Sequence, residues 1–149
     1  MEKYAEHIYN MLLKDVIVPL IGNDTTYLDE LEGVGNLLFK NKFAGVFPSD
    51  KIPKLNNRKR YAILNLDKSG ESGSHWVAIA KYSNDTYIYD SFGRNHEKII
   101  KTLSKSGNGK ITDADLDAEQ EIEETNCGAR CLAWLCVFNY FSPDLAKLI

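Results

Sequence analysis

The stretch NCGARCLAWLCVFNYF, residues 126–141, is apolar along almost its whole length and contains no proline. A helix with apolar side chains around its whole circumference is buried in a protein core or in a membrane. Its longest unbroken apolar run, residues 131–138, is eight residues long, whereas a membrane-spanning helix needs about 20. The stretch therefore predicts a helix over 127–141 that is buried in the core of a globular domain.

Cys127 is expected in the first turn of this helix, because Thr125 and Asn126 before it are residue types that cap helices well. The free N–H groups and partial positive charge of a helix start favour the thiolate, which is the nucleophilic form of cysteine. Cys131 and Cys136 fall inside the helix and are expected to be buried structural thiols. From its position alone, Cys127 could be either a nucleophile or a third structural thiol.

Upstream of the helix, β-branched and aromatic runs at 61–66, 75–82 and 86–89 are separated by Gly-rich or Asn-Asp turns. They predict three successive antiparallel strands. A helix is expected at about 96–104 and a short strand around 120–122. Residues 3–14 predict an amphipathic helix, and a second helix should begin near Thr26 as its N-cap. The apolar faces of these two helices comprise Tyr4, Ile8, Met11 and Leu12, and Leu28, Leu31, Val34, Leu37 and Leu38.

Strands bracketed by helices predict an α+β fold with a small antiparallel sheet packed on helices. The 149 residues, 44% hydrophobic and 26% charged, are expected to form one domain over 1–149. The start, MEKYAEHIYN, lacks the apolar segment of a signal peptide, and three cysteines within ten residues are no disulfide framework. We therefore expect a reducing intracellular compartment and no membrane association.

A reactive thiol needs a base, and His75 is the histidine that heads an apolar strand beside a glycine loop. Asp90 ends the next strand, so two neighbouring strands could present the imidazole and an orienting carboxylate side by side. His7 and His96 lie among polar residues and are expected on the surface. A structural histidine and a turn aspartate remain the alternatives for His75 and Asp90.

Several separated motifs carry a resemblance to a known family. They are GSHWVA at 73–78, DSFG at 90–93, Gln120, and NCG at 126–128, together with NKFAGVFPSDKIP at 41–53 and NLD at 65–67. In this order the chain resembles, over roughly residues 40–141, the cysteine proteases that include the adenovirus maturation protease and the ubiquitin-like-protein deconjugases. It is most similar to the proteases of polinton-like elements, virophages and related DNA viruses.

The resemblance implies a papain-like superfold with the permuted order His-Asp-Gln-Cys and the nucleophile at the start of a buried central helix. Cys127 would be the nucleophile, His75 the base and later the acid, and Asp90 the orienting carboxylate. Gln120 and the backbone N–H of Cys127 would form the oxyanion hole. Trp76 would wall a narrow substrate channel, so cleavage is expected after small residues such as glycine; a core aromatic is the alternative.

The same resemblance implies capsid precursor proteins as substrates, a monomer, no cofactor, and location in the host cytoplasm or the virion. Disulfide-dependent activation by a peptide is not expected, because Cys131 and Cys136 should be buried. The net charge of −3 is unfavourable for nucleic acid. A weak, salt-sensitive DNA contact could still form at a basic loop comprising Lys51, Lys54, Arg58, Lys59 and Arg60.

Other functions compete with this interpretation. A ubiquitin-like-protein deconjugase and a non-catalytic binding module of the same fold are the alternatives. Six acidic residues match the ligand positions of a calcium loop, but Ala118 stands where that loop needs glycine. These residues are Asp113, Asp115, Asp117, Glu119, Glu121 and Glu124. A zinc site formed by the three cysteines is not expected, because their spacings of four and five differ from those of zinc knuckles.

Overall fold

The computed structural model describes residues 1–23, 27–66, 75–91, 97–105, 107–113 and 126–149. Its helices are α1 (Glu2–Leu12), α2 (Val18–Ile21), α3 (Leu28–Phe39), α4 (Glu97–Lys105), α5 (Cys127–Tyr140) and α6 (Pro143–Lys147). A π-helical turn, Leu13–Ile17, joins α1 to α2, and a 3-10 turn, Lys40–Lys42, follows α3. The strands are β1 (Phe43–Pro48), β2 (Tyr61–Asn65), β3 (Trp76–Tyr82), β4 (Asp85–Tyr89) and β5 (Lys110–Asp113).

The five strands form one sheet in the order β1-β2-β3-β4-β5. The three predicted strands are present as β2, β3 and β4, and both of their pairings are antiparallel. The outer pairs β1–β2 and β4–β5 are parallel, so the sheet is mixed and the expectation of an antiparallel sheet was wrong at both edges. Parallel neighbours need a crossover connection, which residues 49–60 supply for β1–β2 and the segment containing α4 supplies for β4–β5.

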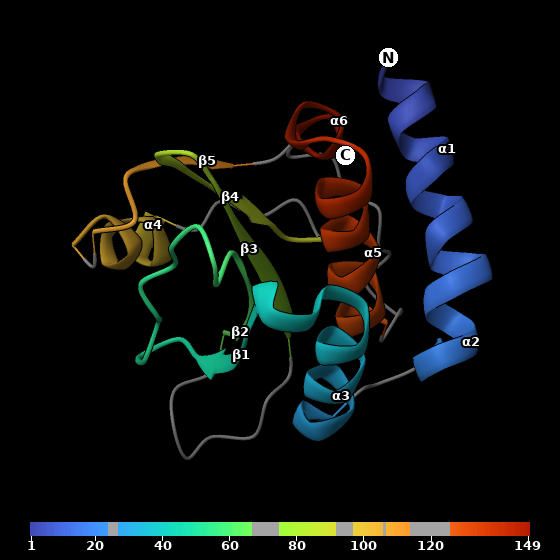
Figure 1. The fold of residues 1–149 in the computed structure, drawn as a ribbon, viewed down its shortest axis with the longest axis horizontal. Helices are drawn as coiled ribbons and strands as arrows, with labels where there is room; N and C mark the ends of the chain where they lie inside the picture. Colours follow the sequence, from blue (N-terminus) through green and yellow to red (C-terminus); the bar gives the residue numbers. More distant parts are fainter. Residues whose placement is uncertain (24–26, 67–74, 92–96, 106, 114–125) are drawn as a thin grey trace.

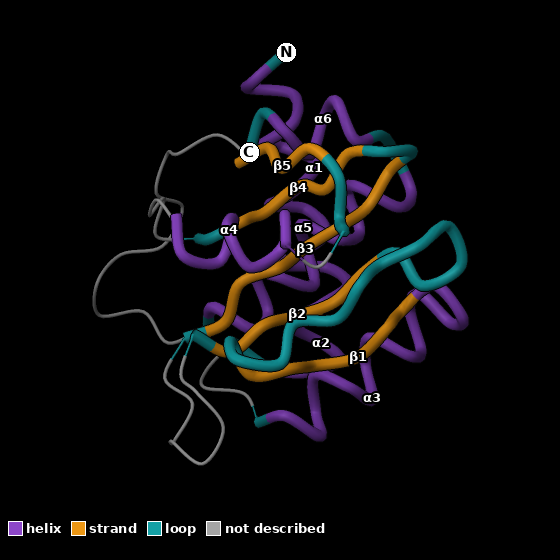
Figure 2. Tube along the Cα trace, turned by 90° about the vertical axis from the view of Figure 1, so that its left-hand side faces the viewer, coloured by secondary structure: helices purple, strands orange, loops and turns teal. Residues whose placement is uncertain are grey.

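Helices cover both faces of the sheet. Figure 1 shows α5, with α1 and α3 beside it, on one face and α4 on the other, and Figure 2 shows α4 in front of the strands. Side chains alternate between the faces, as strand geometry requires. In β3, Trp76, Ala78 and Ala80 belong to the core under α5, whereas Val77 and Ile79 belong to the core under α4. The α+β architecture is therefore a sheet between two helical layers.

The central helix α5 is buried from Cys127 through Phe138, as its apolar sequence predicted. It packs on β3, where Ala78 and Ala80 are small enough to let a helix approach closely. Trp134 of α5 is fully buried and stacks on Tyr89 of β4, with ring centroids 5.3 Å apart and planes at 5°. The site residues at the start of α5 are consequently attached to the most buried element of the fold.

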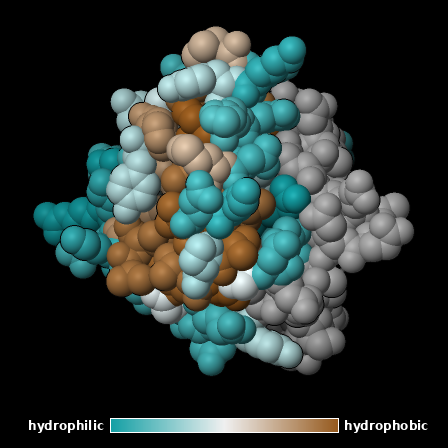
Figure 3. Space-filling model, turned by 90° about the vertical axis from the view of Figure 1, so that its right-hand side faces the viewer, coloured by the Kyte–Doolittle hydropathy of each residue, from teal (hydrophilic) through white to brown (hydrophobic). Residues whose placement is uncertain are grey.

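The N-terminal helices bury some residues of the predicted apolar faces, such as Ile8 and Leu31, and expose others. In α1, Ala5, Ile8 and Tyr9 are buried, whereas Tyr4 and Met11 are 55% and 43% exposed. Tyr9 was not among the apolar residues named for this helix, although it is fully buried and its hydroxyl contacts that of Tyr89. Figure 3 views the outer side of these helices and shows hydrophobic residues gathered over part of that surface.

Helix α3 begins after Tyr27, whose backbone N–H donates to Glu30 Oε1 at 3.1 Å; the predicted cap, Thr26, lies outside the described residues. Leu28 and Leu37 are exposed rather than on the buried stripe. Gly35 is buried on this helix. It packs against the ring of Phe43 so closely that a Cβ at this position would collide with the ring. This glycine lets α3 lie close against β1.

Three short elements were not predicted from the sequence. Two of them are strand β1 and helix α6. The last strand is β5, Lys110–Asp113, whereas the strand expected around 120–122 lies outside the described residues. Among the described residues, no helix is both long enough and apolar enough to cross a membrane.

Candidate active site

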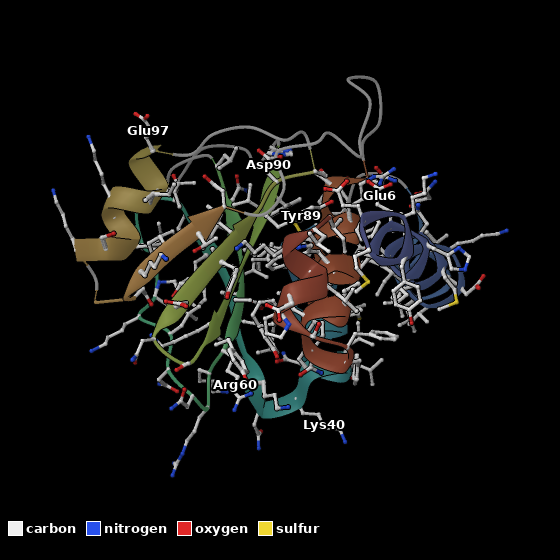
Figure 4. All side chains as sticks on the ribbon, turned by 90° about the horizontal axis from the view of Figure 1, so that it is seen from above. Glu6, Lys40, Arg60, Tyr89, Asp90 and Glu97 are labelled. Carbon is white, nitrogen blue, oxygen red and sulfur yellow. The ribbon has the colours of Figure 1, made fainter. Side chains whose placement is uncertain are left out.

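The side chains of His75 and Asp90 meet at one end of the sheet. His75 directly precedes β3 and Asp90 directly follows β4, and because these strands are antiparallel, the two residues lie at the same end. His75 Nε2 and Asp90 Oδ1 are 2.6 Å apart. Both residues are buried, with 5% and 6% of their surface exposed. Figure 4 shows Asp90 at this end, remote from Arg60 and Lys40 at the other.

The backbone fixes the position of the imidazole. The carbonyl of His75 accepts a 3.0 Å hydrogen bond from the N–H of Leu66, which extends the β2–β3 ladder by one residue. His75 is therefore held by the sheet and oriented by a carboxylate from the neighbouring strand.

Cys127 is the first residue of α5 and is 6% exposed. Its side chain is close enough to His75 to help raise the pKa of the imidazole. Asn126 occupies the N-cap position, but its side chain does not cap the helix. The amide oxygen instead accepts from Arg130 Nε at 3.1 Å, and the amide nitrogen donates to Asn23 Oδ1 at 2.8 Å. The sequence had predicted a capping role for this asparagine, whereas its side chain serves a network behind the thiol.

The environment of His75 favours its protonated form. Burial alone would lower the pKa of the imidazole, but hydrogen bonds to Asp90 and Cys127 and the negative charges of both groups outweigh burial and raise it from 6.5 to about 9. At neutral pH the imidazole is then mostly imidazolium. The arrangement therefore places a proton donor beside the sulfur of Cys127.

The other two thiols are in the opposite situation. Burial raises the pKa of Cys136 to about 12. Burial, reinforced by the negative charges of Cys127 and Asp90, also raises the pKa of Cys131 well above its ordinary value. Both are buried, free cysteines, as expected from their position in the helix. Of the three thiols, Cys127 is the one with a histidine partner among the described residues.

The remaining predicted site residues have different outcomes. Trp76 is 6% exposed and lies in the same core cluster as Cys127, so its role at a substrate channel stays a prediction. His7 is exposed on α1. Gln120, His96 and the acidic segment from 114 to 124 lie outside the described residues. In the part of the chain that the structure describes, no group of three His, Cys, Asp or Glu side chains could hold a metal ion.

Sequence reasoning missed a polar network behind the site. Arg130 is 9% exposed, and its Nη1 donates to the hydroxyl of Tyr9 at 3.2 Å. The Tyr9 hydroxyl lies 2.8 Å from that of Tyr89. The signal that could have found this network is Arg130 itself, the one charged residue in an otherwise apolar helix. A buried guanidinium requires hydrogen-bond partners, and the apolar pattern does not say where they are.

Comparison with known proteins gives little. No protein-family model matches the chain, and no curated protein matches it. Among solved structures, the crystal structure of the ASFV pS273R protease is similar, with 18% sequence identity and a TM-score of 0.30. The matched region covers 60% of this chain and 42% of that one, so it spans less than half the length of the ASFV protein. A likeness at this level carries no argument about function, which rests on the site itself.

Proposed function

We propose that the chain is a cysteine endopeptidase in which Cys127 is the nucleophile, His75 the general base and acid, and Asp90 the orienting carboxylate. One observation carries the proposal: a buried His–Asp pair with a 2.6 Å contact has the thiol at the start of α5 as its second neighbour. A nucleophile, a base and a group that orients the base are the arrangement that acyl transfer requires. The resemblance in the sequence motifs names the same three residues.

In the proposed reaction His75 holds the proton of the Cys127 thiol while the sulfur attacks the scissile carbonyl carbon and a C–S bond forms. His75 gives this proton to the leaving amine as the C–N bond breaks, and a thioester remains. A water molecule, deprotonated by His75, attacks the thioester, the C–S bond breaks, and the carboxylic acid product leaves. Asp90 binds Nε2 throughout, which leaves Nδ1 for the proton transfers.

The oxyanion that forms in each attack needs donors aimed at it. The backbone N–H of Cys127, at the first position of α5, is suited to this because helix-start N–H groups have no partner within the helix. We assign the second donor to the side chain of Gln120, as the family resemblance implies. No bound metal or cofactor takes part in this scheme.

For the substrate we propose capsid precursor proteins cut after small residues, glycine above all. Trp76 follows the base on β3 and is 6% exposed, so it would present an edge rather than a whole ring to a substrate. A bulky side chain beside that edge would be excluded. A peptide library with equal acceptance of bulky and small residues at this position would remove the channel from the proposal.

Thiol labelling tests the nucleophile. Iodoacetamide at low excess should modify Cys127 before Cys131 and Cys136, and the preference should disappear in His75→Ala. The matched control is His7→Ala, which removes an exposed histidine from α1 and should leave the preference intact. Equal and slow labelling of all three thiols in the wild type would instead indicate a non-catalytic binding module.

Substrate class is tested separately, by incubating the protein with a capsid precursor from its own genome and with a panel of ubiquitin-like modifier precursors. Cleavage of the capsid precursor, lost in Cys127→Ala, supports the maturation protease. Cleavage of a modifier precursor alone would make the chain a deconjugase.

A further inference from the structure

Four buried polar side chains form a continuous chain from β4 to the start of α5. The Tyr89 and Tyr9 hydroxyls are 2.8 Å apart, Arg130 Nη1 donates to Tyr9 at 3.2 Å, and Arg130 Nε donates to Asn126 Oδ1 at 3.1 Å. Tyr9 comes from α1, so the chain joins three elements. These four side chains form the Tyr9–Arg130 network, which has Tyr89 and Asn126 as its two ends.

Each end of this network is covalently next to a site residue. Tyr89 precedes Asp90, and Asn126 precedes Cys127. The side chains of Tyr89 and Asn126 are 1% and 3% exposed, so neither can relax into solvent. A shift of either end would move the backbone that carries Asp90 or Cys127.

The network is also braced against rotation. The ring of Tyr89 stacks on Trp134 of α5, and the ring of Tyr9 meets that of Tyr89 edge-on, with centroids 6.1 Å apart. The guanidinium carbon of Arg130 lies 6.0 Å from the centre of the Tyr9 ring. Arginine suits this place because its rigid fork reaches two acceptors in different directions, which a lysine ammonium on a flexible stem does not fix equally well.

We propose that Tyr9 and Arg130 are positioning residues that set the distance and orientation between Cys127 and the His75–Asp90 pair. The proposal rests on the proposed function for its catalytic meaning, but the geometry it concerns can be measured without any substrate. It assigns a role to helix α1, which lies outside the region of family resemblance at roughly 40–141. The N-terminal helix then takes part in assembling the site as well as in covering the core.

Tyr9→Phe is the decisive variant, because it removes the hydroxyl at the middle of the network and keeps the ring. The matched control is Tyr61→Phe. Tyr61 lies in the same core, and its hydroxyl donates to Asn139 Oδ1 at 2.9 Å near the other end of α5. Tyr9→Phe loses the contacts of its hydroxyl with Tyr89 and Arg130, and Tyr61→Phe loses the hydrogen bond to Asn139. A fall in the melting temperature is therefore expected for both variants.

Two measurements read the site itself: the rate of Cys127 alkylation by iodoacetamide as a function of pH, and the titration of the His75 ring by NMR, assigned with His75→Ala. In Tyr9→Phe we expect alkylation at neutral pH to slow about tenfold and the pKa of His75 to fall. Asn126→Ala should change both in the same direction from the other end of the network. Tyr61→Phe should leave both unchanged.

The proposal is overturned if Tyr9→Phe leaves the alkylation rate and the His75 titration as in the wild type, or if Tyr61→Phe changes them equally. Failure of the proposed function is a separate result: wild-type Cys127 would then label no faster than Cys131 and Cys136. In that case the pKa of His75 in Tyr9→Phe still shows whether the Tyr9–Arg130 network positions His75.

Discussion

On the α4 face of the sheet the buried asparagine, Asn108, binds backbone groups, whereas on the α5 face Tyr9, Arg130 and Asn126 bind one another. Asn108 is fully buried; its Oδ1 accepts from the N–H of Leu55 at 2.8 Å, and its Nδ2 donates to the carbonyl of Pro53 at 3.4 Å. These bonds fasten the 49–60 crossover loop. On the α5 face the partners are side chains of three different elements.

The difference separates two uses of buried polar groups. A side-chain amide that forms hydrogen bonds with the backbone of a loop holds that loop in place. A site on the far side of the sheet is unaffected as long as the sheet folds. Side chains that bind one another fix relative orientation, which a reaction requires to within a fraction of an ångström. The α4 face should therefore contribute stability alone, and the α5 face both stability and reactivity.

The strongest test of this comparison is removal of the site residues themselves. Cys127→Ala or His75→Ala should lower peptide turnover by at least about a thousandfold, because both groups form or break bonds in the proposed reaction. Asp90→Asn should lower it less, since Asp90 orients His75. Circular dichroism should show that all three variants fold. Turnover at the wild-type rate in Cys127→Ala would refute the assignment of the nucleophile.

A matched pair of leucines tests the two faces against each other. Leu103 of α4 and Leu132 of α5 are both fully buried, and replacement of either by alanine should cost about 2–5 kcal/mol of unfolding free energy, measured by denaturant titration. In protein that remains folded, Cys127 of Leu103→Ala should be alkylated at the wild-type rate. Alkylation of Cys127 in Leu132→Ala should be slower. Equal slowing in both variants would mean that the faces do not differ as described.

The pH dependence of stability tests whether His75, on the α5 face, is protonated in the folded protein. The folded-state pKa of His75, about 9, exceeds the unfolded value of 6.5, so its contribution is fully present below pH 6.5 and is lost as pH rises through 9. The melting temperature should fall across this window. Asp90→Asn, which removes the strongest hydrogen-bond partner, should flatten the fall. A wild-type melting temperature that rises from pH 6.5 to 9 would contradict this.

The smallest expected effect belongs to the basic loop of the α4 face. Lys51, Lys54, Arg58 and Lys59 are exposed, and Arg60 is half-buried with its Nε donating to the carbonyl of Asn57 at 2.7 Å. Duplex DNA should stimulate turnover at most about twofold in low salt, and the effect should vanish near about 200 mM salt. Arg58→Glu should remove it. Strong stimulation that persists in high salt would assign this loop a larger role.

The sequence was sufficient for the parts of the fold whose pattern is local. The buried α5 helix follows from a continuous apolar run, and the three central strands follow from β-branched and aromatic runs separated by Gly-rich or Asn-Asp turns. The outer strands could not be predicted in the same way. β1 and β5 pair in parallel through crossovers, and nothing within either segment states which distant strand it will join.

The site was predictable to a similar extent. His75, Asp90 and Cys127 stand at element ends, where sequence motifs and strand geometry coincide, and their chemistry narrows the choice further. The network behind them was not predictable, since Tyr9 and Arg130 are far apart in sequence and each has an ordinary interpretation alone. Tyr9 was also not among the residues named for the apolar face of its helix. Only the packing of α1 against α5 brings the two together.

The π-helical turn at Leu13–Ile17 has a consequence for how α1 lies along α5. The buried residues Ala5, Tyr9, Leu13 and Ile17 recur every four residues, and in a regular α-helix each such step overshoots a full turn by about 40°. Over three steps the drift would reach about 120° and carry Ile17 off the shared face. The π turn has more residues per turn than an α-helix, so it offsets part of this rotation. Ile17 therefore stays on the same buried face as Ala5 and Tyr9. A single-residue deletion there should close the π turn into regular α-helix and leave Ile17 within about 20° of the shared face.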